Sequence, residues 1–295
     1  MSNFSAVLVG INKYPGAPLR GCVNDVIIMR DILVKIYKIP ASQIRLVLDE
    51  RATKDNILER MEWLITNEAE NKLFYYSGHG AQIPTQDYSV DNYEPDAMDE
   101  LMCPVDFNWE GNYILDNQIE QLMQKLKAEH HISMVVDACH SGTIDRAATN
   151  SAIKIKQIPT PLDLMSRMSD VSLTKDLFEH KPTFGEVDEA DKNFFSFLFP
   201  TEEVVVPVAT PSYSKHNISI ITGCKDDQTS ADAYFSNRYQ GALSFVMQSI
   251  LLKNPKIDLK TLRDKCEEVL KRRKFEQTPQ LICSEPNLVK PFIQV

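Results

Sequence analysis

The sequence is poor in glycine and has no long apolar run, and both shortages narrow what the chain can be. Only ten of its 295 residues are glycine. Their positions are therefore informative, because glycine permits tight turns and a close approach of the backbone to a ligand. No apolar run approaches the ~20 residues that a membrane-spanning helix needs. We therefore expect no membrane partner.

Metal-binding cysteine patterns are also missing. None of the six cysteines forms a C-x-x-C pair, and no Cys and His residues have the spacing of zinc ligands. The N-terminal residues M-S-N-F-S-A-V-L-V-G-I lack a basic region and a small-residue cleavage site, so they predict a first strand rather than a signal peptide. The sequence thus predicts reduced thiols in the cytosol, or in the nucleus. The cysteines stand at positions 22, 103, 139, 224, 266 and 283.

Basic residues are not in excess either. The chain has 32 Lys and Arg against 41 Asp and Glu, which gives a formal net charge of −9 and a pI near 5.2. This balance argues against a nucleic-acid partner and mildly favours basic partners. With 43% hydrophobic and 25% charged residues, the composition is that of a globular protein, long enough for one large α/β domain or two small ones.

The apolar segments alternate between strand-like and helix-like patterns, which predicts an α/β fold. Over the first 80 residues they follow the order β-α-β-α-β, which predicts a parallel sheet with right-handed crossovers. Residues 143–217 have no periodic pattern and are far longer than a usual connection, so this segment is functional, disordered or folded onto the body. The predicted strands are 4–11, 43–49, 72–78, 132–139, 218–224 and 277–284, with a hairpin at 101–115, helices at 23–37, 54–67, 116–127, 241–252 and 259–273, and a polar loop at 226–235.

Two of the apolar runs end in chemically useful side chains. Residues 132–142 read I-S-M-V-V-D-A-C-H-S-G, and residues 72–80 read K-L-F-Y-Y-S-G-H-G. Each run suits a buried parallel strand, and ligands of open α/β sheets bind just outside the carboxyl ends of such strands. Half of the ten glycines fall at or just past the ends of apolar runs, at positions 10, 78, 80, 142 and 223.

Cys139 and His79 stand at these two strand ends. A thiolate is the nucleophilic form of cysteine, and it needs a partner that takes the proton. His79 suits this role better than the adjacent His140, because successive residues of an extended backbone point to opposite sides. The N–H of Gly80, together with that of Cys139, would form an oxyanion hole. Taken singly, each side chain would more often be an inert core thiol or a structural imidazole.

The motifs around these residues resemble those of metacaspases, the caspase-like cysteine peptidases of clan CD, family C14. Y-Y-S-G-H-G-A-Q and D-A-C-H-S-G match the His and Cys motifs, and four shorter motifs follow in the family's order. The resemblance implies a caspase-hemoglobinase fold, in which helices flank both faces of a mostly parallel six-stranded sheet. It implies that His79 is the acid and base and that Cys139 is the nucleophile. The shorter motifs are G-C-V-N-D at 21–25, D-E-L-M-C-P-V-D at 99–106, D-Q-T-S-A-D-A at 227–233 and T-P-Q-L at 278–281.

The resemblance also implies how the chain is organised. Residues 1–142 match the large, p20-like catalytic region, and residues 218–295 match the small, p10-like region that completes the same domain. Residues 143–217 form a linker or insert between them. An insert here, without an N-terminal extension, resembles the type II arrangement of the family.

The side chains near the predicted site favour a basic substrate residue. Asp137 lies two residues before Cys139, on the same side of the strand, and Asp25 begins the first helix near the strand ends. Carboxylates bind Lys or Arg through charge-assisted hydrogen bonds. Simpler structural roles stay open for both carboxylates: Asp25 as a helix N-terminal charge, and Asp137 as a buried partner of another donor. By resemblance, the S1 pocket is formed by Cys22, Asp25, Ser77 and Asp137.

The resemblance further implies a calcium site and no organic cofactor. The matching carboxylates are Asp99 and Asp116, with Asn117 where the family often has Asp. Hard cations take oxygen ligands, and Glu100 would replace the charge that Asn117 lacks. The alternative for residues 87–100 is a solvated acidic loop.

The insert suggests regulation, because it leaves the sheet directly after Cys139. We predict that one of its basic side chains lies over Cys139 in the uncleaved zymogen and is cut in cis or in trans on activation. A passive surface loop is the alternative. The candidate processing sites are Arg146, Lys154, Lys156, Arg167 and Lys175.

These observations predict a cytosolic, self-processing and calcium-activated endopeptidase that cleaves peptides and proteins after Arg or Lys through an acyl-enzyme. The resemblance favours a monomer. Two rival functions stay open. The first is a peptide ligase or another acyl transferase on the same dyad, since an acyl-thiol reacts with whatever nucleophile arrives. The second is a non-catalytic scaffold with the same fold.

Overall fold

The computed structural model describes residues 3–84, 98–139, 153–161, 164, 217–225 and 228–295. The chain divides into two compact units. The first comprises Met1–Thr160 and Ser212–Val295, and the second comprises Pro161–Pro211. Only Pro161 and Leu164 of the second unit are among the described residues. All elements below belong to the first unit.

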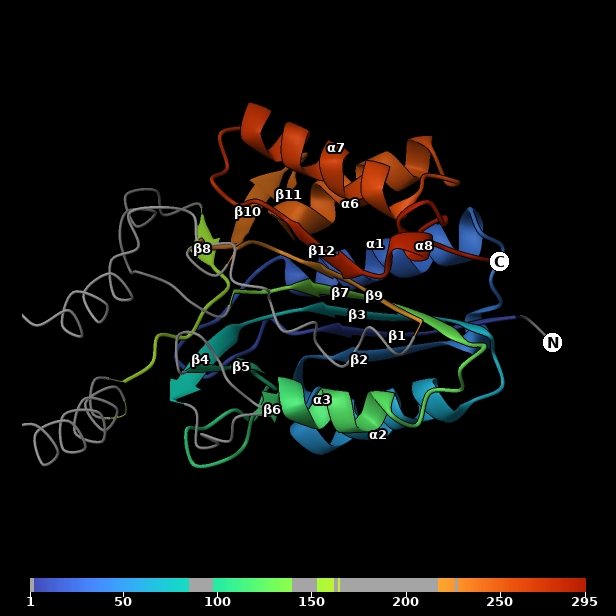
Figure 1. Cartoon of the computed structure of the whole chain (residues 1–295). Coiled ribbons are helices and arrows are strands. Elements are labelled where there is room, and N and C mark those ends of the chain that lie inside the picture. The colour runs from blue at the N-terminus through green and yellow to red at the C-terminus, as the bar shows by residue number, and fades with distance from the viewer. Residues whose placement is uncertain (1–2, 85–97, 140–152, 162–163, 165–216, 226–227) are drawn as a thin grey trace, which may run out of the picture. The chain divides into compact units, whose positions relative to one another are not determined.

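A six-stranded sheet with the strand order β12-β9-β7-β3-β1-β2 forms the centre of this unit (Figure 1). Every neighbouring pair is parallel except β12 and β9, which are antiparallel. The predicted mostly parallel, six-stranded α/β fold is therefore confirmed. The strands are β1 (Phe4–Gly10), β2 (Ile44–Leu48), β3 (Asn71–Ser77), β7 (His131–Asp137), β9 (Ile218–Thr222) and β12 (Gln280–Cys283).

Helices cover both faces of the sheet (Figure 1). One face packs against α1 (Cys22–Lys35), α6 (Ala242–Lys253) and α7 (Leu259–Arg272), and the other against α2 (Lys54–Thr66) and α3 (Asp116–Met123). Along β1, Val7 and Val9 belong to the core beneath α2 and α3, whereas Ala6 and Leu8 belong to the core beneath α1 and α6. A strand buried on both faces has no polar alternation, which explains why these strands are continuous apolar runs. Short helical segments are η1 (Ala41–Gln43), η2 (Asp49–Arg51) and α8 (Glu285–Leu288).

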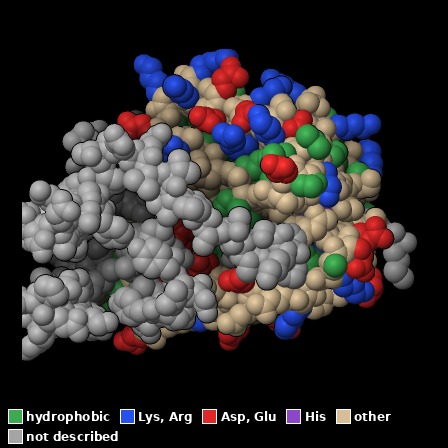
Figure 2. All heavy atoms as spheres, in the orientation of Figure 1, with side chains coloured by type: hydrophobic (Ala, Val, Ile, Leu, Met, Phe, Trp, Pro, Cys, Tyr) green, Lys and Arg blue, Asp and Glu red, His purple; other side chains and the backbone are tan. Residues whose placement is uncertain are grey.

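Capping residues fix the ends of two of these helices. The Thr53 hydroxyl accepts a hydrogen bond from the N–H of Asn56 at 3.4 Å, as expected for the N-cap of α2. At α7, the Asp258 carboxylate accepts one from the N–H of Thr261 at 2.8 Å. Basic and acidic side chains intermix along α7 at the top of the view in Figure 2. Its ion pairs with the spacing of one helical turn are Lys260–Asp264, Arg263–Glu267 and Arg272–Glu268.

Two small antiparallel sheets flank the carboxyl ends of the central strands. The first contains β4 (Gly80–Pro84), β5 (Met98–Met102) and β6 (Ile114–Leu115), which confirms the predicted pairing around residues 101–115. The second contains β8 (Lys154–Ile155), β10 (Ala231–Phe235) and β11 (Arg238–Gly241).

The prediction of a polar loop that ends at residue 235 was wrong, because its last five residues form β10. Ser236 and Asn237, the two residues between β10 and β11, have φ angles of 44° and 66°. Such positive angles at both central residues are typical of a tight hairpin turn that matches the strand twist. No helix in the described part of the chain is long and apolar enough to cross a membrane.

Candidate active site

The predicted nucleophile and base come together at the carboxyl edge of the central sheet. Strands β3 and β7 are neighbours, and Ser77 lies opposite Asp137 at their ends. His79 and Cys139 each follow two residues later, so both leave the sheet at the same point. Both side chains are buried, with exposed fractions of 2% and 0%.

The imidazole of His79 is held as a neutral base. Its Nε2 lies 2.7 Å from the carbonyl oxygen of Ala17, so Nε2 carries the proton and Nδ1 is left with the lone pair. The ring of Tyr14 packs against the imidazole, with centroids 4.5 Å apart, and the hydroxyl of Tyr76 donates to the His79 carbonyl at 2.7 Å. Burial lowers the pKa of His79 to about 4. The ring is therefore uncharged near neutral pH.

The sulfur of Cys139 has partners other than this base. It lies 3.1 Å from the sulfur of Cys224 and accepts a hydrogen bond from the N–H of Ser230. Nδ1 of His79 has no hydrogen-bond partner among the described residues. The thiol and the imidazole thus lie at one edge but are not hydrogen-bonded, and direct proton transfer between them requires the two groups to approach.

The four residues predicted to form the S1 pocket do assemble, and they enclose a lysine of the same chain. The ammonium of Lys156 lies 3.0 Å from Oδ2 of Asp137 and 3.5 Å from Oδ2 of Asp25, and it donates to the Ser77 hydroxyl at 2.8 Å. Ser77 in turn donates to Asp25 at 2.8 Å. Cys22 is buried beside them, and its thiol interacts electrostatically with Lys156. All five side chains are excluded from solvent.

Burial and charge act in opposite directions in this pocket. Burial raises the pKa of Asp25 to about 7, although Lys156 opposes the shift. Burial would lower the pKa of Lys156, but the carboxylates of Asp137 and Asp25 outweigh it and raise that pKa well above its usual value. A buried ion pair is strongly destabilised when one partner is removed. The pocket is therefore complementary to a cationic side chain.

The backbone of Lys156 is bound as well. Its carbonyl oxygen accepts hydrogen bonds from the N–H of Gly80 and from that of Cys139, each at 3.1 Å. These are the two N–H groups that the sequence predicts as an oxyanion hole. The N–H of Lys156 donates to the Ser230 carbonyl at 3.0 Å, and the N–H of Ile158 donates to the Gly80 carbonyl at 2.9 Å. The segment from β8 to Ile158 therefore lies extended in the site.

Residues that the sequence motifs did not single out hold the pocket in shape. The Ser230 hydroxyl donates to Oδ1 of Asp137 at 2.7 Å, and both the N–H and the hydroxyl of Ser244 donate to its Oδ2. The N–H of Gly241 donates to Asp25, and a Cβ atom at Gly241 would overlap Oδ2 of Asp137 and Nζ of Lys156. The only sequence signal for these roles was the D-Q-T-S-A-D-A motif, which contains Ser230.

A third carboxylate, Asp232, lies near the pocket. Its Oδ2 accepts a hydrogen bond from the N–H of Arg20 at 2.7 Å, and its Oδ1 has no hydrogen-bond partner among the residues that the structure describes. Burial raises the pKa of Asp232, and Lys156 opposes this shift. Asp232 therefore adds negative charge near the ammonium without forming an ion pair with it.

The predicted calcium ligands lie on two connected elements. Asp99 and Glu100 are on β5, and Asp116 and Asn117 begin α3, which follows β6. Within the described ranges, no group of three or more His, Cys, Asp or Glu side chains is arranged to hold a metal ion. The predicted set therefore does not form such a group here. Residues 85–97, which contain most of the acidic run, lie outside the described residues.

Among the candidate processing sites, only Lys156 reaches the pocket within the described part of the insert. Lys154 pairs with Asp232 in register and donates its ammonium to the carbonyl of Pro18, outside the pocket. Arg146, Arg167 and Lys175 lie outside the described residues.

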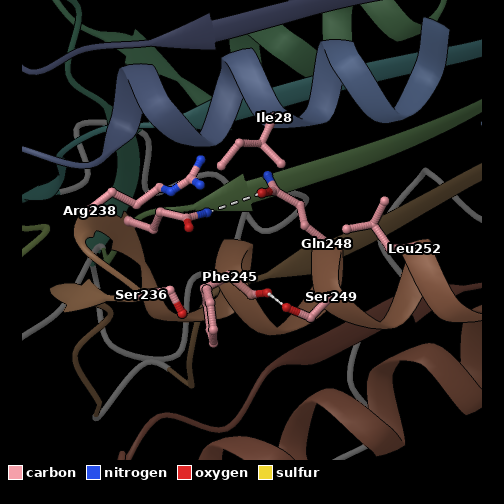
Figure 3. A pocket seen from close by; sticks show the side chains of 8 residues that line it. Ile28, Ser236, Arg238, Phe245, Gln248, Ser249 and Leu252 are labelled. Atoms are coloured by element: carbon pink, nitrogen blue, oxygen red, sulfur yellow. Dashed lines mark hydrogen bonds between the residues drawn. The ribbon is translucent and has the colours of Figure 1, made fainter. Parts of the chain in front are cut away.

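A separate cavity contains none of these groups. It is bordered by α1, the β10–β11 hairpin and α6 (Figure 3). Within its lining, Gln240 donates to Gln248 at 3.2 Å and the Ser249 hydroxyl donates to the Phe245 carbonyl at 2.7 Å. Gln248 also donates to the backbone carbonyl of Asp25 at 2.8 Å. Arg238 is its only titratable lining residue. The cavity offers no nucleophile or base.

Comparisons with known proteins agree with the site. Residues 5–146 match the family model described as "Metacaspase, peptidase C14 domain". Metacaspase-1 of Pyricularia oryzae is 30% identical over 292 residues, which is 95% of this chain and 72% of that relative. Metacaspase-1A of Aspergillus oryzae is 31% identical over 291 residues (95% and 68%), and Metacaspase-1 of Schizosaccharomyces pombe is 30% identical over 292 residues (95% and 67%).

A solved structure supports the fold alone. The crystal structure of protein GSU0716 from Geobacter sulfurreducens superimposes with a TM-score of 0.60 and covers 97% of this chain and 96% of its own. The two sequences are 20% identical. This likeness extends over the whole architecture and carries no information on the reaction.

Proposed function

The chain belongs to the metacaspase family of caspase-like cysteine peptidases, and from this premise we propose that it is an endopeptidase that cleaves after Lys or Arg and processes itself after Lys156. Cys139 is the nucleophile and His79 the acid and base. The observation that carries the proposal is the position of Lys156, whose ammonium contacts Asp137 while its carbonyl oxygen accepts from two backbone N–H groups.

The preference for a basic side chain follows from the composition of the pocket. An ammonium or guanidinium supplies N–H donors to two buried carboxylates, through charge-assisted hydrogen bonds that are about twice as strong as neutral ones. An apolar side chain would leave Asp25 and Asp137 buried without a cation, and an acidic one would add a like charge. Both alternatives are disfavoured by the same electrostatics.

The reaction uses groups that surround Lys156, after the thiol of Cys139 and the imidazole of His79 have approached each other. Nδ1 of His79 takes the proton of the Cys139 thiol, and the thiolate attacks the carbonyl carbon of Lys156. The N–H groups of Gly80 and Cys139 stabilise the negative charge that develops on the carbonyl oxygen. The amine of Gln157 leaves with a proton from His79. Water, deprotonated by His79, then hydrolyses the acyl-enzyme.

Self-processing follows from the same geometry. The Lys156–Gln157 bond is the one presented to Cys139, and the flanking backbone is held in strand β8 against β10. Fragment analysis tests this directly. Wild-type chain should yield a fragment that begins at Gln157, and Cys139→Ala should stay intact. Lys154→Ala should still be cut, because its side chain lies outside the pocket. A wild-type fragment that begins elsewhere would contradict the assignment.

Calcium activation, a cytosolic or nuclear location and a monomeric state are parts of the proposal that need separate support. Calcium is supported by the family resemblance alone, and no step of the reaction is assigned to it. Location is supported by the state of the cysteines, since all six are free thiols. Monomeric behaviour is checked by light scattering on the Cys139→Ala variant.

A panel of fluorogenic peptides tests the peptidase activity. Peptides that end in Arg, Lys or Asp are incubated with the chain, with and without calcium, beside Cys139→Ala. We expect cleavage after Arg and Lys only. Cleavage after Asp alone would exclude the proposed specificity. Product analysis with added amines separates hydrolysis from peptide ligation, and a biological effect that survives in Cys139→Ala would favour a scaffold.

A further inference from the structure

A second thiol lies against the nucleophile and has no part in the proposed reaction. Cys139 follows β7 and Cys224 follows β9, and these strands are parallel neighbours with Val136 opposite Thr222 (Figure 1). The two sulfur atoms are 3.1 Å apart. A disulfide has an S–S length of about 2.05 Å. The two sulfur atoms therefore need to approach by only about 1 Å for a bond to form.

We propose that Cys224 is the resolving thiol of Cys139, so that peroxide converts the processed enzyme into a reversibly inactive form with a Cys139–Cys224 disulfide. The inference rests on the proposed function in two respects: Cys139 is the nucleophile, and cleavage after Lys156 opens the site to peroxide. The modification itself is defined by the two sulfur atoms and can be detected without any assay of peptidase activity.

The chemistry takes two balanced steps. In the first, the Cys139 thiolate attacks hydrogen peroxide, the O–O bond breaks, and sulfenic acid and hydroxide are formed, so sulfur loses two electrons and peroxide gains them. In the second, the Cys224 sulfur attacks the sulfenic sulfur. The S–S bond forms, the S–O bond breaks, and the hydroxyl leaves as water with the thiol proton. A dithiol reductant restores both thiols by exchange.

The environment of the two thiols separates their roles. The hydrogen bond to Cys139, followed by burial and the charge of Cys139, raises the pKa of Cys224. Cys224 therefore stays protonated, and the sulfur that reacts with peroxide is that of Cys139, whose proton His79 takes in the proposed reaction. Oxidation removes the negative charge of Cys139, and with it one contribution to the raised pKa of Cys224. Cys224 becomes a better nucleophile at the stage where its attack is needed.

Occupation of the site determines when this oxidation occurs. In the uncleaved chain Cys139 has no exposed surface, and the carbonyl of Lys156 is hydrogen-bonded to its N–H. Peroxide reaches the sulfur only after this segment has left. We therefore expect the processed enzyme to be oxidised readily and the uncleaved chain to be protected.

Peptide mapping on the processed wild-type enzyme provides the main test. After treatment with hydrogen peroxide and alkylation of free thiols, non-reducing digestion should give one cross-linked peptide pair, from Cys139 and Cys224, with the loss of two hydrogens. A Cys139 found as sulfinic acid, or linked to another cysteine, while Cys224 is alkylated, would overturn the proposal. The same digest shows whether the chain has been cut after Lys156, so an uncut sample reports failure of the proposed function, whereas a cut sample without the cross-link reports failure of the inference.

Recovery of activity provides a second test. Each variant is treated with hydrogen peroxide and then reduced with dithiothreitol. Its recovered activity is expressed relative to its own activity before treatment. Wild-type enzyme should recover most of its activity. Cys224→Ser should recover about tenfold less, because an unresolved sulfenic acid proceeds to irreversible sulfinic acid. Equal recovery of the two would overturn the proposal.

The matched control is Cys283→Ser. Cys283 pairs with Ser219, at the opposite end of β9 from Cys224. The activity of the Cys283→Ser variant should recover as fully as that of wild type. Thermal unfolding of each variant checks that it is folded, and the mapping of the wild-type enzyme does not depend on any substitution.

Discussion

The Nζ of Lys156 lies 3.0 Å from Oδ2 of Asp137, and neither side chain has any surface exposed to solvent. Lys156 comes from the insert, and Asp137 ends the strand that leads to the nucleophile. An ion pair in this position contributes to specificity more than to stability, because desolvation offsets much of the attraction between the charges. Replacing Lys156 and replacing Asp137 should therefore have separable effects on folding and on cleavage.

Loss of the insert's charge should destabilise the uncleaved chain. In a Cys139→Ala background, Lys156→Met should lower the free energy of unfolding by about 3 kcal/mol, because it leaves buried carboxylates unpaired. Lys156→Arg keeps the charge and should lose much less. Urea unfolding followed by circular dichroism measures both. Equal stability of the Met and Arg variants would show that the ion pair does not hold the segment.

Loss of the pocket's charge should reduce cleavage of added substrates. We expect Asp137→Asn to lower kcat/KM for Lys and Arg peptides by about 10²–10³-fold, the range given by losing one partner of a buried charge pair. Asp232→Asn is the matched control, since Asp232 lies near the pocket but has no ion pair with Lys156 within the described residues. Its effect should be about tenfold or less. Equal losses in the two variants would indicate that the negative charge around the pocket, rather than a direct contact between Asp137 and the substrate cation, favours basic substrates.

Self-cleavage should persist to unusually low pH. Burial lowers the pKa of His79 to about 4, against an ordinary value of 6.5. The base form is therefore lost only as the pH falls through about 4, and the acid limb of the self-cleavage rate should lie there. In the processed enzyme the site opens to water, and the acid limb of kcat/KM for peptides should move up towards 6.5. Identical acid limbs would show that the segment does not desolvate the ring.

The lowered pKa of His79 also affects stability. The unfolded chain takes up a proton at His79 below about 6.5, whereas the folded chain does so only near 4. Stability contributed by this group is therefore present above pH 6.5 and is lost as the pH falls towards 4. His79→Gln should reduce the loss of stability between these values, which urea unfolding at a series of pH values measures.

A methyl group at residue 241 should close the pocket. The Cβ of Gly241→Ala would overlap Asp137 and Lys156, so we expect both self-cleavage and peptide cleavage to fall at least about 100-fold with the overall fold retained. Gly111→Ala is the control, because Gly111 has a φ of 123° and no neighbour within 4 Å of the added atom. It should lose about 1 kcal/mol of stability and keep cleavage. Full activity of Gly241→Ala would contradict a tightly closed pocket at this position.

Removal of calcium should slow self-processing. If calcium activates the enzyme, excess chelator should lower the rate at least about tenfold, and added calcium but not magnesium should restore it, because the two ions differ in size and coordination. Asp116→Asn should weaken the response. A rate that is unchanged in chelator would exclude this part of the proposal.

Local sequence patterns predicted the central sheet and several residues of the candidate active site. The apolar runs of β3 and β7 are buried on both faces, and a strand of this kind can be recognised without knowledge of its neighbours. Because parallel strands end at one edge, the same pattern placed His79 and Cys139 at that edge, although the two side chains are not hydrogen-bonded. It also placed Asp25 and Asp137 near this edge, and the family resemblance added Cys22 and Ser77.

Contacts between segments far apart in the chain could not be predicted in this way. Strand β8 has only two residues, and its pairing with β10 depends on the bound position of Lys156. The five basic candidates in the insert were chemically equivalent in sequence. Ser230, Gly241 and Ser244 shape the pocket through hydrogen bonds to Asp137 and Asp25, and a small polar residue in a loop or at a helix start carries no pattern that reveals its partner.

The position of the scissile bond determines what happens after the cut. Lys156 lies C-terminal to Cys139 in the sequence, so hydrolysis after Lys156 leaves both on one polypeptide, with only the intervening residues as a tether. A tether of this length maintains a millimolar effective concentration of the product end. The new terminus carries a carboxylate where the peptide had a neutral carbonyl, and this anion would face the active-site thiolate. Departure of the product is then opposed by the ion pairs of Lys156 and favoured by repulsion between these like charges, and dilution has little influence.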